Sequence, residues 1–342
     1  MNILFTCAGR RNYLINYFKQ ALNSNGKVIA VDMQLSAPAL VEANVAQKVP
    51  SIDDGEYIST IERIIQEEKV NAIISLNDFE LPILAQNKKR LEKTGARLLI
   101  SPANVIDICF DKWKTYHFLL ENEIKTPKTY ISLESAKEAL YKKDIQLPLV
   151  VKPRWGSASI GIDIVYTEEE LELSFRLQHL KVSRSIPKDI SAPDAKNCIV
   201  IQEKIHGEEY GVDILNNLDG EYHGTFVRKK LAMRSGETDK AISVIDERFN
   251  TIAKKVSHAT KHVGNMDCDF FIANGEVYFL EMNPRFGGGY PFSHEAGINT
   301  PALYIAWLNN ETGLDQYNQF KPGMAFSKCD RILKIPKETT IK

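Results

Sequence analysis

Strand-like and helix-like patterns alternate over the first hundred residues, and this alternation limits the possible fold more than any other feature of the chain. Short apolar runs are separated by segments whose apolar residues recur at the spacing of an amphipathic helix. The predicted strands are residues 2–7, 28–31, 72–76 and 97–100, and the predicted helices begin near Tyr13 and span 58–68 and 82–92. Strands that alternate with helices indicate a parallel, doubly wound α/β sheet with a crevice at the C-terminal ends of its strands.

Two arginines, Arg10 and Arg11, follow the first predicted strand in a loop that contains Gly9. The loop lacks G-x-G-x-x-G, so it gives little support for dinucleotide binding. At the predicted crevice the two arginines could hold an anionic substrate. A solvated helix start is an equally good interpretation, and the sequence leaves both open.

Length and composition restrict the class of protein. A chain of 342 residues is too long for one small core, so two or three packed units are expected. A net charge of −1 gives no reason to expect a nucleic-acid partner, and no apolar run is long enough to span a membrane. The first residues do not resemble a signal peptide. Five scattered cysteines without CxxC spacing favour reduced thiols, and hence a cytoplasmic protein, over disulfides or a zinc site.

A loop of small residues lies between two predicted strands in the middle of the chain. Residues 147–152 form an apolar strand that ends at Lys152, and the loop leads into an alternating strand at 162–165. Strand, loop and strand predict a flap over a ligand, whereas a Walker loop leads into a helix, and the sequence contains no such motif. The neighbouring predictions are one helix over 104–122, a helix over 168–180 and a polar loop over 182–197.

The following segment is rich in strands and carries a basic stretch. The predicted strands are residues 198–204, 210–215 and 221–228, and the predicted helices are 246–264 and the part of 290–308 beyond Ser293. Arg228, Lys230 and Arg234 lie on the polar segment 228–240. They could bind a carboxylate substrate, or they could belong to a solvated basic loop.

Residues 266–289 combine an apolar hairpin with a polar end followed by three glycines. A two-residue turn at Asn274-Gly275 would put Asp269 and Glu281 on opposite faces, because side chains alternate along a strand. A three-residue turn that includes Ala273 would make them diagonal neighbours on one face. We predict the three-residue turn.

The polar end of this hairpin suits a magnesium ion. Asp269 and Glu281 could bracket a hard cation, and Asn283 lies two residues further on the same face. Magnesium prefers a few carboxylate oxygens together with phosphate oxygens and water. The alternative is a surface hairpin with a solvated acidic end, and carboxylates on opposite faces would exclude the metal site.

Four stretches, taken in order, resemble the ATP-grasp superfamily. They are Lys112 with its helix, VVKPRWGSASIG, IQEKIHGEEYGVDIL and DFFIANGEVYFLEMNPR. The nearest likeness is to the ATP-grasp modules of the carbamoyl-phosphate synthetase large subunit. The resemblance implies a pre-ATP-grasp domain over residues 1–103, an N-terminal lobe with a phosphate flap over 104–195, and a C-terminal lobe with a metal site over 196–342.

The resemblance also implies roles for individual residues. The nucleotide-binding residues would be Lys112, Lys152, Ser157, Gln202, Glu203, Lys204, Ile205 and Glu209. Of these, Lys112 and Lys152 would contact phosphates, residues 202–205 would read adenine, and Glu209 would hold the ribose. Asp269, Glu281 and Asn283 would bind Mg²⁺, with Mn²⁺ as a substitute. Arg285, Lys152 and Arg228 would serve catalysis, with Arg285 facing the transferred phosphoryl group.

The resemblance implies a ligase that activates a carboxylate with ATP and transfers it to an amine, releasing ADP and phosphate. Two alternatives remain open. One is phosphorylation of bicarbonate or carbamate, as in carbamoyl-phosphate synthetase, and the other is a regulatory subunit that binds ATP without turnover. The expected partners are small-molecule substrates, and a homodimer is a possible assembly.

Overall fold

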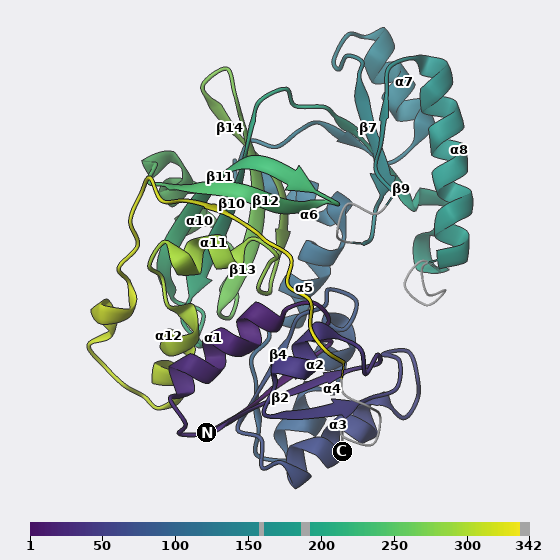
Figure 1. The fold of residues 1–342 in the computed structure, drawn as a ribbon. Helices are drawn as coiled ribbons and strands as arrows, with labels where there is room; N and C mark the ends of the chain where they lie inside the picture. Colours follow the sequence, from purple (N-terminus) through teal and green to yellow (C-terminus); the bar gives the residue numbers. More distant parts are fainter. Residues whose placement is uncertain (157–160, 186–191, 336–342) are drawn as a thin grey trace.

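Three β-sheets organise the computed structural model, which describes residues 1–156, 161–185 and 192–335 (Figure 1). The first sheet is parallel throughout and has the strand order β3-β2-β1-β4-β5. Its domain contains β1 (Asn2–Thr6), α1 (Asn12–Leu22), β2 (Lys27–Asp32), α2 (Pro38–Glu42), β3 (Val45–Lys48), α3 (Tyr57–Glu67), β4 (Ala72–Ser75), α4 (Leu81–Glu92) and β5 (Arg97–Leu98). The predicted N-terminal α/β domain is confirmed. Only the short α2 and β3 were not predicted.

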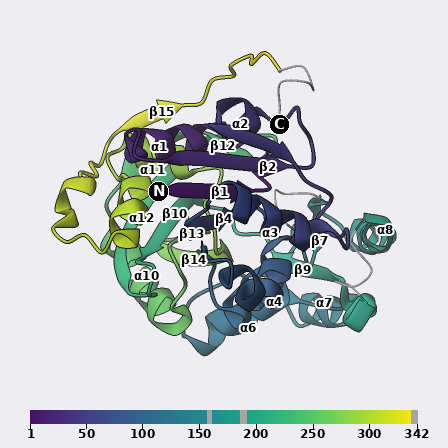
Figure 2. The ribbon, with the colours of Figure 1, turned by 90° about the horizontal axis from the view of Figure 1, so that it is seen from below.

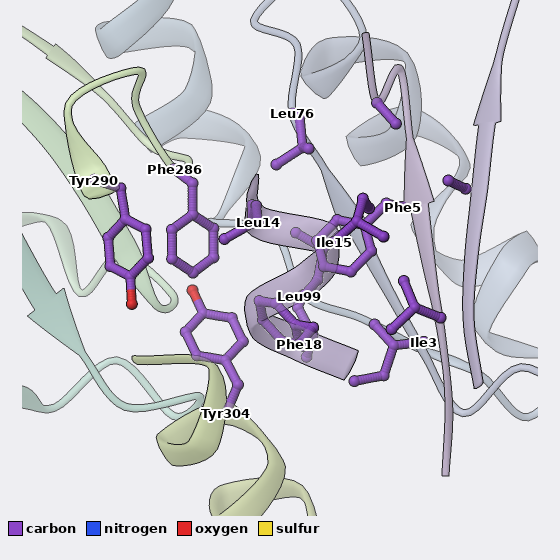
Figure 3. Close-up of a cluster of buried hydrophobic side chains, with 14 of the residues drawn as sticks. Ile3, Phe5, Leu14, Ile15, Phe18, Leu76, Leu99, Phe286, Tyr290 and Tyr304 are labelled. Atoms are coloured by element: carbon purple, nitrogen blue, oxygen red, sulfur yellow. The ribbon is translucent and has the colours of Figure 1, made fainter. Parts of the chain in front are cut away.

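One face of this sheet shares its core with the C-terminal part of the chain. Phe18 of α1 makes edge-to-face contacts with Phe286 and Tyr304, at ring-centroid distances of 6.1 and 6.0 Å (Figure 3). Figure 2 shows α12 (Thr300–Leu308) beside α1. Burial of each such aromatic side chain is worth about 1.5–3 kcal/mol. A common core therefore holds the N-terminal domain in a fixed position against the C-terminal lobe.

The predicted single helix over 104–122 is wrong, because it is broken at Asp111. The chain forms α5 (Ala103–Phe110) and α6 (Lys112–Glu121), and Asp111 between them is extended, with φ −105° and ψ 106°. The Asp111 carboxylate accepts hydrogen bonds from the backbone N–H groups of Trp113 and Lys114 and caps α6. Lys112 is thus the first residue of a helix, not a residue in its middle.

The second sheet is antiparallel and has the order β6-β9-β7-β8. Its elements are β6 (Thr129–Tyr130), α7 (Leu133–Tyr141), β7 (Leu149–Pro153), β8 (Asp163–Val165), α8 (Glu168–Ser185), the 3-10 helix η1 (Ala192–Asn197) and β9 (Ile199–Glu203). The polar loop predicted over 182–197 is wrong at both ends, since α8 continues to Ser185 and η1 precedes β9; residues 186–191 lie outside the described part. Because β9 pairs with β6 and β7, we propose that the N-terminal lobe extends through Glu203.

The third sheet is antiparallel and has the order β14-β13-β10-β11-β12-β15. The C-terminal lobe contains β10 (Glu208–Asn216), β11 (Tyr222–Arg234), β12 (Glu237–Val244), α10 (Glu247–Thr260), β13 (Asn265–Ala273), β14 (Glu276–Asn283), α11 (Tyr290–Glu295), α12, the 3-10 helix η2 (Leu314–Tyr317) and β15 (Ala325–Ser327). The solvated loop considered for 228–240 is wrong, because these residues form the β11–β12 hairpin. The helix predicted beyond Ser293 is also interrupted, and Gly297 there has φ +118°. Within the ranges given above, no helix is long and apolar enough to cross a membrane.

The turn predicted for the β13–β14 hairpin is wrong. Ala273 pairs with Glu276 across a two-residue turn in which Asn274 and Gly275 have φ +51° and +80°, as a type I′ turn requires. A bulge at Leu280 then shifts the register, so that Asp269 lies directly opposite Glu281. Directly opposed residues share a face, so the two carboxylates are on one side of the sheet through the bulge and not through the turn.

Candidate active site

A cavity of about 780 Å³ lies where the three sheets converge, a size typical of small-ligand pockets. Its walls come from the loop after β4, the ends of β7 and β9, and the faces of β10 to β14. The predicted site residues that line it are Lys112, Lys152, Gln202, Glu203, Lys204, Ile205, Glu209, Arg228, Asp269, Glu281, Asn283 and Arg285. Ser157 lies outside the described residues. The fold thus places the other predicted residues around one cavity.

Lys152 is a buried cation near the end of β7. Its Nζ donates a hydrogen bond to Gln202 Oε1 at 2.8 Å, and the Gln202 amide donates to Thr129 at 2.9 Å. Burial lowers the pKa of Lys152 to about 8, although the charge of Glu281 opposes this shift. The antiparallel pairing of β7 and β9 places Lys152 beside the strand that carries Gln202.

The break before α6 holds the first part of the flap. Arg154 donates hydrogen bonds to both carboxylate oxygens of Asp111, at 2.8 and 2.7 Å. The backbone of Asp111 also forms an isolated antiparallel β-bridge with Trp155. Lys112 Nζ donates to the Gly156 carbonyl at 2.6 Å. The sequence pattern gave no sign of the pairing between Arg154 and Asp111, because the two residues are 43 positions apart.

Lys230 connects two residues with different predicted roles. Its Nζ lies 2.6 Å from Glu209 Oε1 and 2.6 Å from Asp269 Oδ1. Burial would lower the Lys230 pKa, but Asp269 and Glu209 together raise it above its ordinary value. One oxygen of Asp269 is therefore already in an ion pair with a fully charged ammonium group.

Glu281 and Asn283 line the cavity, and within the described ranges their side chains make no hydrogen bond or ion pair. In the same residues, no group of three or more histidine, cysteine, aspartate or glutamate side chains could hold a metal ion alone. Two carboxylates and an amide oxygen match the partial set that Mg²⁺ uses when phosphate oxygens and water complete its coordination. These residues fit that kind of site.

Arg228 is only 2% exposed and lies beneath the cavity floor. Its guanidinium donates to Asp213 Oδ2 and Asp267 Oδ1, each at 2.6 Å. A Cβ atom at Gly211 or Gly289 would come within 2.7 or 2.3 Å of its Nε. The catalytic and substrate-binding roles of Arg228 stay predictions, and a substrate carboxylate would have to compete with Asp213 and Asp267 for its guanidinium.

Arg285 is joined to the N-terminal domain. It donates to Asp78 Oδ2 at 2.5 Å and to the Phe286 carbonyl at 3.0 Å. Burial would lower its pKa, but the pairing with Asp78 raises it overall. Arg11 of the N-terminal domain similarly donates to Glu237 of β12 at 2.9 Å, while Arg10 lines a separate cavity with Arg234.

Asp78, Glu237 and Asp267 are cavity residues that sequence reasoning missed. Burial raises the pKa of Asp267 to about 6, with Arg228 opposing and Asp269 adding to the shift. Its position two residues before Asp269 in a strand was a usable signal, because period-two alternation puts both on one face. Asp78 and Glu237 gave no such signal, since they meet their partners only through the tertiary fold.

Comparison with known proteins identifies the class. The ATP-grasp domain profile matches residues 109–289, and a profile described as the PylC-like N-terminal domain matches residues 3–99. The chain belongs to the ATP-grasp family. This family contains ATP-dependent carboxylate–amine ligases and carboxylases.

Individual relatives are distant. The carbamoyl phosphate synthase large chain of Campylobacter jejuni is 26% identical over 293 residues, which cover 82% of this chain and 25% of that protein. The chain thus spans about a quarter of that relative. The biotin carboxylase domain of Hydrogenobacter thermophilus 2-oxoglutarate carboxylase, solved with MgADP and bicarbonate, superposes with a TM-score of 0.73 at 17% identity, over 95% of this chain and 73% of that one. An L-amino acid ligase from Bacillus licheniformis superposes with a TM-score of 0.66 at 20% identity, over 90% of this chain and 74% of that one.

Proposed function

We propose that the protein is an ADP-forming ligase that joins a carboxylic acid to an amine through an acyl phosphate. The supporting observation is that Lys152 and Arg285 share one cavity with Glu281 and Asn283. Among the described residues, the side-chain oxygens of Glu281 and Asn283 have no hydrogen-bond partner, so they are available to bind a metal ion. Phosphoryl transfer requires mainly positioning and compensation of negative charge. Cations and metal-binding oxygens in one cavity meet both requirements.

The nucleotide would lie between the second and third sheets. In this proposal the backbone of residues 202–205, at the end of β9 and just after it, reads the adenine edge, and Glu209 holds the ribose. Lys112 and Lys152 offer point charges to the phosphates. The pairing of Lys112 with the Gly156 carbonyl would have to open for this contact.

Glu281, Asn283 and the second oxygen of Asp269 would hold Mg²⁺, and Mn²⁺ suits the same oxygen ligands. When bound, the metal ion would neutralise phosphate charge. Arg285 would add a planar guanidinium beside the transferred group. The flap over 154–161, part of which lies outside the described residues, would exclude water.

The proposed reaction balances in two steps. A carboxylate oxygen bonds to the γ-phosphorus of ATP as the bond to ADP breaks. The nitrogen of the amine then bonds to the acyl carbon, and phosphate leaves with one oxygen of the original carboxylate. The proton released by the amine passes to solvent.

A second candidate is phosphorylation of bicarbonate. It is favoured by the similarity to carbamoyl phosphate synthase, and the structurally similar biotin carboxylase was solved with bicarbonate. The biotin carboxylase domain is named as a dimer. A homodimer is therefore the assembly to test for this chain, by sedimentation.

The test is ADP release with Mg-ATP across panels of carboxylates and amines, with bicarbonate as a separate arm. Turnover that needs both an acid and an amine supports the ligase. Turnover with bicarbonate alone supports the second candidate, and tight ATP binding without turnover indicates a regulatory protein. For an active pair, ¹⁸O in the carboxylate should appear in the released phosphate, and its absence would exclude the acyl phosphate.

A further inference from the structure

The end of the cavity beyond Arg285 carries equal numbers of positive and negative groups. Three arginine–carboxylate pairs lie there: Arg285 with Asp78 at 2.5 Å, Arg228 with Asp267 at 2.6 Å, and Arg11 with Glu237 at 2.9 Å. Asp78 and Arg11 come from the N-terminal domain, and the other four residues come from the C-terminal lobe. This end is therefore built at the junction of the two parts.

The backbone between these pairs has no space for side chains. A Cβ atom at Gly287 would lie 2.0 Å from the Asp267 carboxyl carbon, and one at Gly288 would lie 3.1 Å from that of Glu237. Neither glycine has a positive φ, so close approach is the reason for glycine here. The glycine backbone also accepts a hydrogen bond from Tyr13, at 3.4 Å to the Gly287 carbonyl. The two carboxylates consequently pack directly on the glycine backbone, and Gly288 still lines the cavity.

Two of the three pairs are closed, and one is accessible. The Arg285 and Asp78 side chains are 9% and 8% exposed, and Arg228 is 2% exposed. Arg11 and Glu237 are 20% and 46% exposed. Glu237 also borders the separate cavity of about 460 Å³, where Lys328 lies 3.3 Å from it. A substrate can therefore insert between Arg11 and Glu237 without opening a buried ion pair.

We propose that this junction binds a substrate that carries both a carboxylate and an ammonium group, the chemistry of a free amino acid, with Arg11 facing the carboxylate and Glu237 facing the ammonium. The inference rests on the proposed ligase and names the class of its amine. A purely anionic substrate would separate Arg11 from Glu237 and leave Glu237 beside negative charge, with only the longer contact to Lys328, at 3.3 Å, to offset it. A doubly charged substrate gives each side chain a new partner of the correct sign, so the local charge stays balanced.

The experiment uses the full chain and surveys the amino acids one by one. Each of the twenty proteinogenic amino acids is titrated calorimetrically into protein that holds Mg²⁺ and ADP, and each is also assayed for ADP release with a carboxylate panel. For any amino acid that binds, the amide that lacks the carboxylate and the acid that lacks the amine are compared. Both analogues should bind at least tenfold more weakly.

Three variants locate the site. Arg11→Gln and Glu237→Gln should each raise the KM for the amino acid at least tenfold and leave the KM for Mg-ATP within twofold. Arg97→Gln is the matched control, because Arg97 also forms an ion pair between the two parts, with Asp219 at 2.9 Å, but both partners are exposed and away from the cavity. The control should change neither KM.

The outcomes separate this inference from the ligase proposal. ADP release with simple amines or with bicarbonate, at rates equal to those with amino acids, would overturn the junction site while leaving an active enzyme. Binding that survives the loss of either charge, or no binding by any of the twenty amino acids, would also overturn it. Amino-acid binding without any ADP release would retain the site and reject the ligase.

Discussion

The guanidinium of Arg285 donates a hydrogen bond to the Asp78 carboxylate at 2.5 Å, across the boundary between the C-terminal lobe and the N-terminal domain. Asp78 follows β4, at the C-terminal edge of the parallel sheet, where the loops of doubly wound domains form binding crevices. Arg285 follows β14 and lines the same cavity as Lys152. The N-terminal domain thus helps to position a residue that we assign to phosphoryl transfer.

Asp78→Asn should lower kcat by roughly 10- to 100-fold, because small displacements of a positioned catalytic group have effects of this size. The KM for Mg-ATP should change less than kcat, because Asp78 acts through Arg285 alone and the proposed contacts of Lys112, Lys152, residues 202–205 and Glu209 with the nucleotide remain. Loss of a buried charge partner also costs about 3–5 kcal/mol, so folding is checked by circular dichroism and kcat is measured below the melting temperature. Asp219→Asn removes an exposed ion pair between the same two parts and serves as the control. Unchanged kcat in folded Asp78→Asn would remove Asp78 from the mechanism.

Glu281→Gln should abolish magnesium-dependent ADP release while the melting temperature stays within a few degrees. The substitution keeps the shape of the side chain but removes the charge that would bind the metal ion, and no ion pair of Glu281 in the described residues is lost. Glu276→Gln is the matched control, because Glu276 lies on the same strand beside the turn and pairs only weakly with Lys125, at 3.6 Å. Titration of Mn²⁺ followed by electron paramagnetic resonance gives a readout without turnover. Normal metal affinity in Glu281→Gln would contradict the assignment.

The sequence allowed prediction of those features that depend on local periodicity. The alternating strands and helices of the N-terminal domain and the apolar strands of the hairpin follow from spacing alone. The break at Asp111 did not, because the helical spacing of apolar residues continues through 104–122 and hides the local cap that Asp111 forms on α6. The bulge at Leu280 was hidden for a similar reason, since one extra residue in a strand leaves no local pattern.

The candidate site was predictable where polar residues end apolar strands, as Lys152 and Glu281 do. It was not predictable where charge partners come from distant segments. In the sequence, Arg228 belongs to a basic, polar segment and resembles a solvated residue. Only the fold places Asp213 and Asp267 around it. Pairing in three dimensions, and not residue type, decides that this arginine is buried.

His262 should make the protein less stable in mild acid. It is fully buried, and its Nε2 lies 3.1 Å from the Ile214 carbonyl. Burial lowers its pKa from 6.5 to about 4, although the bond to Ile214 opposes the shift. The unfolded chain therefore binds more protons between these pH values, so this contribution is complete above pH 6.5 and is lost as the pH falls to about 4.

The loss should approach roughly 3 kcal/mol, at 1.36 kcal/mol for each pKa unit. The measurement is the free energy of unfolding in urea at about pH 7.5 and about pH 4.5, on either side of most of this titration. His262→Gln, which can still donate to the Ile214 carbonyl, should show a smaller difference between the two. His294, whose pKa burial also lowers to about 4, remains in both proteins and cancels in the comparison. Equal differences in the two proteins would exclude His262 as the titrating group.

Gly289→Ala should destabilise the protein by about 1–3 kcal/mol, the usual cost of overpacking, and should also reduce turnover. The added Cβ would lie 2.3 Å from Arg228 Nε, and Arg228 cannot move aside easily because Asp213 and Asp267 hold it. Gly55→Ala is the control, since no atom lies within 4 Å of a Cβ there and Gly55 has no positive φ. Urea unfolding and ADP release are measured for both variants. A Gly289→Ala protein as stable as Gly55→Ala would show that Arg228 can relocate, and the floor beneath the proposed substrate site would then be adaptable instead of fixed.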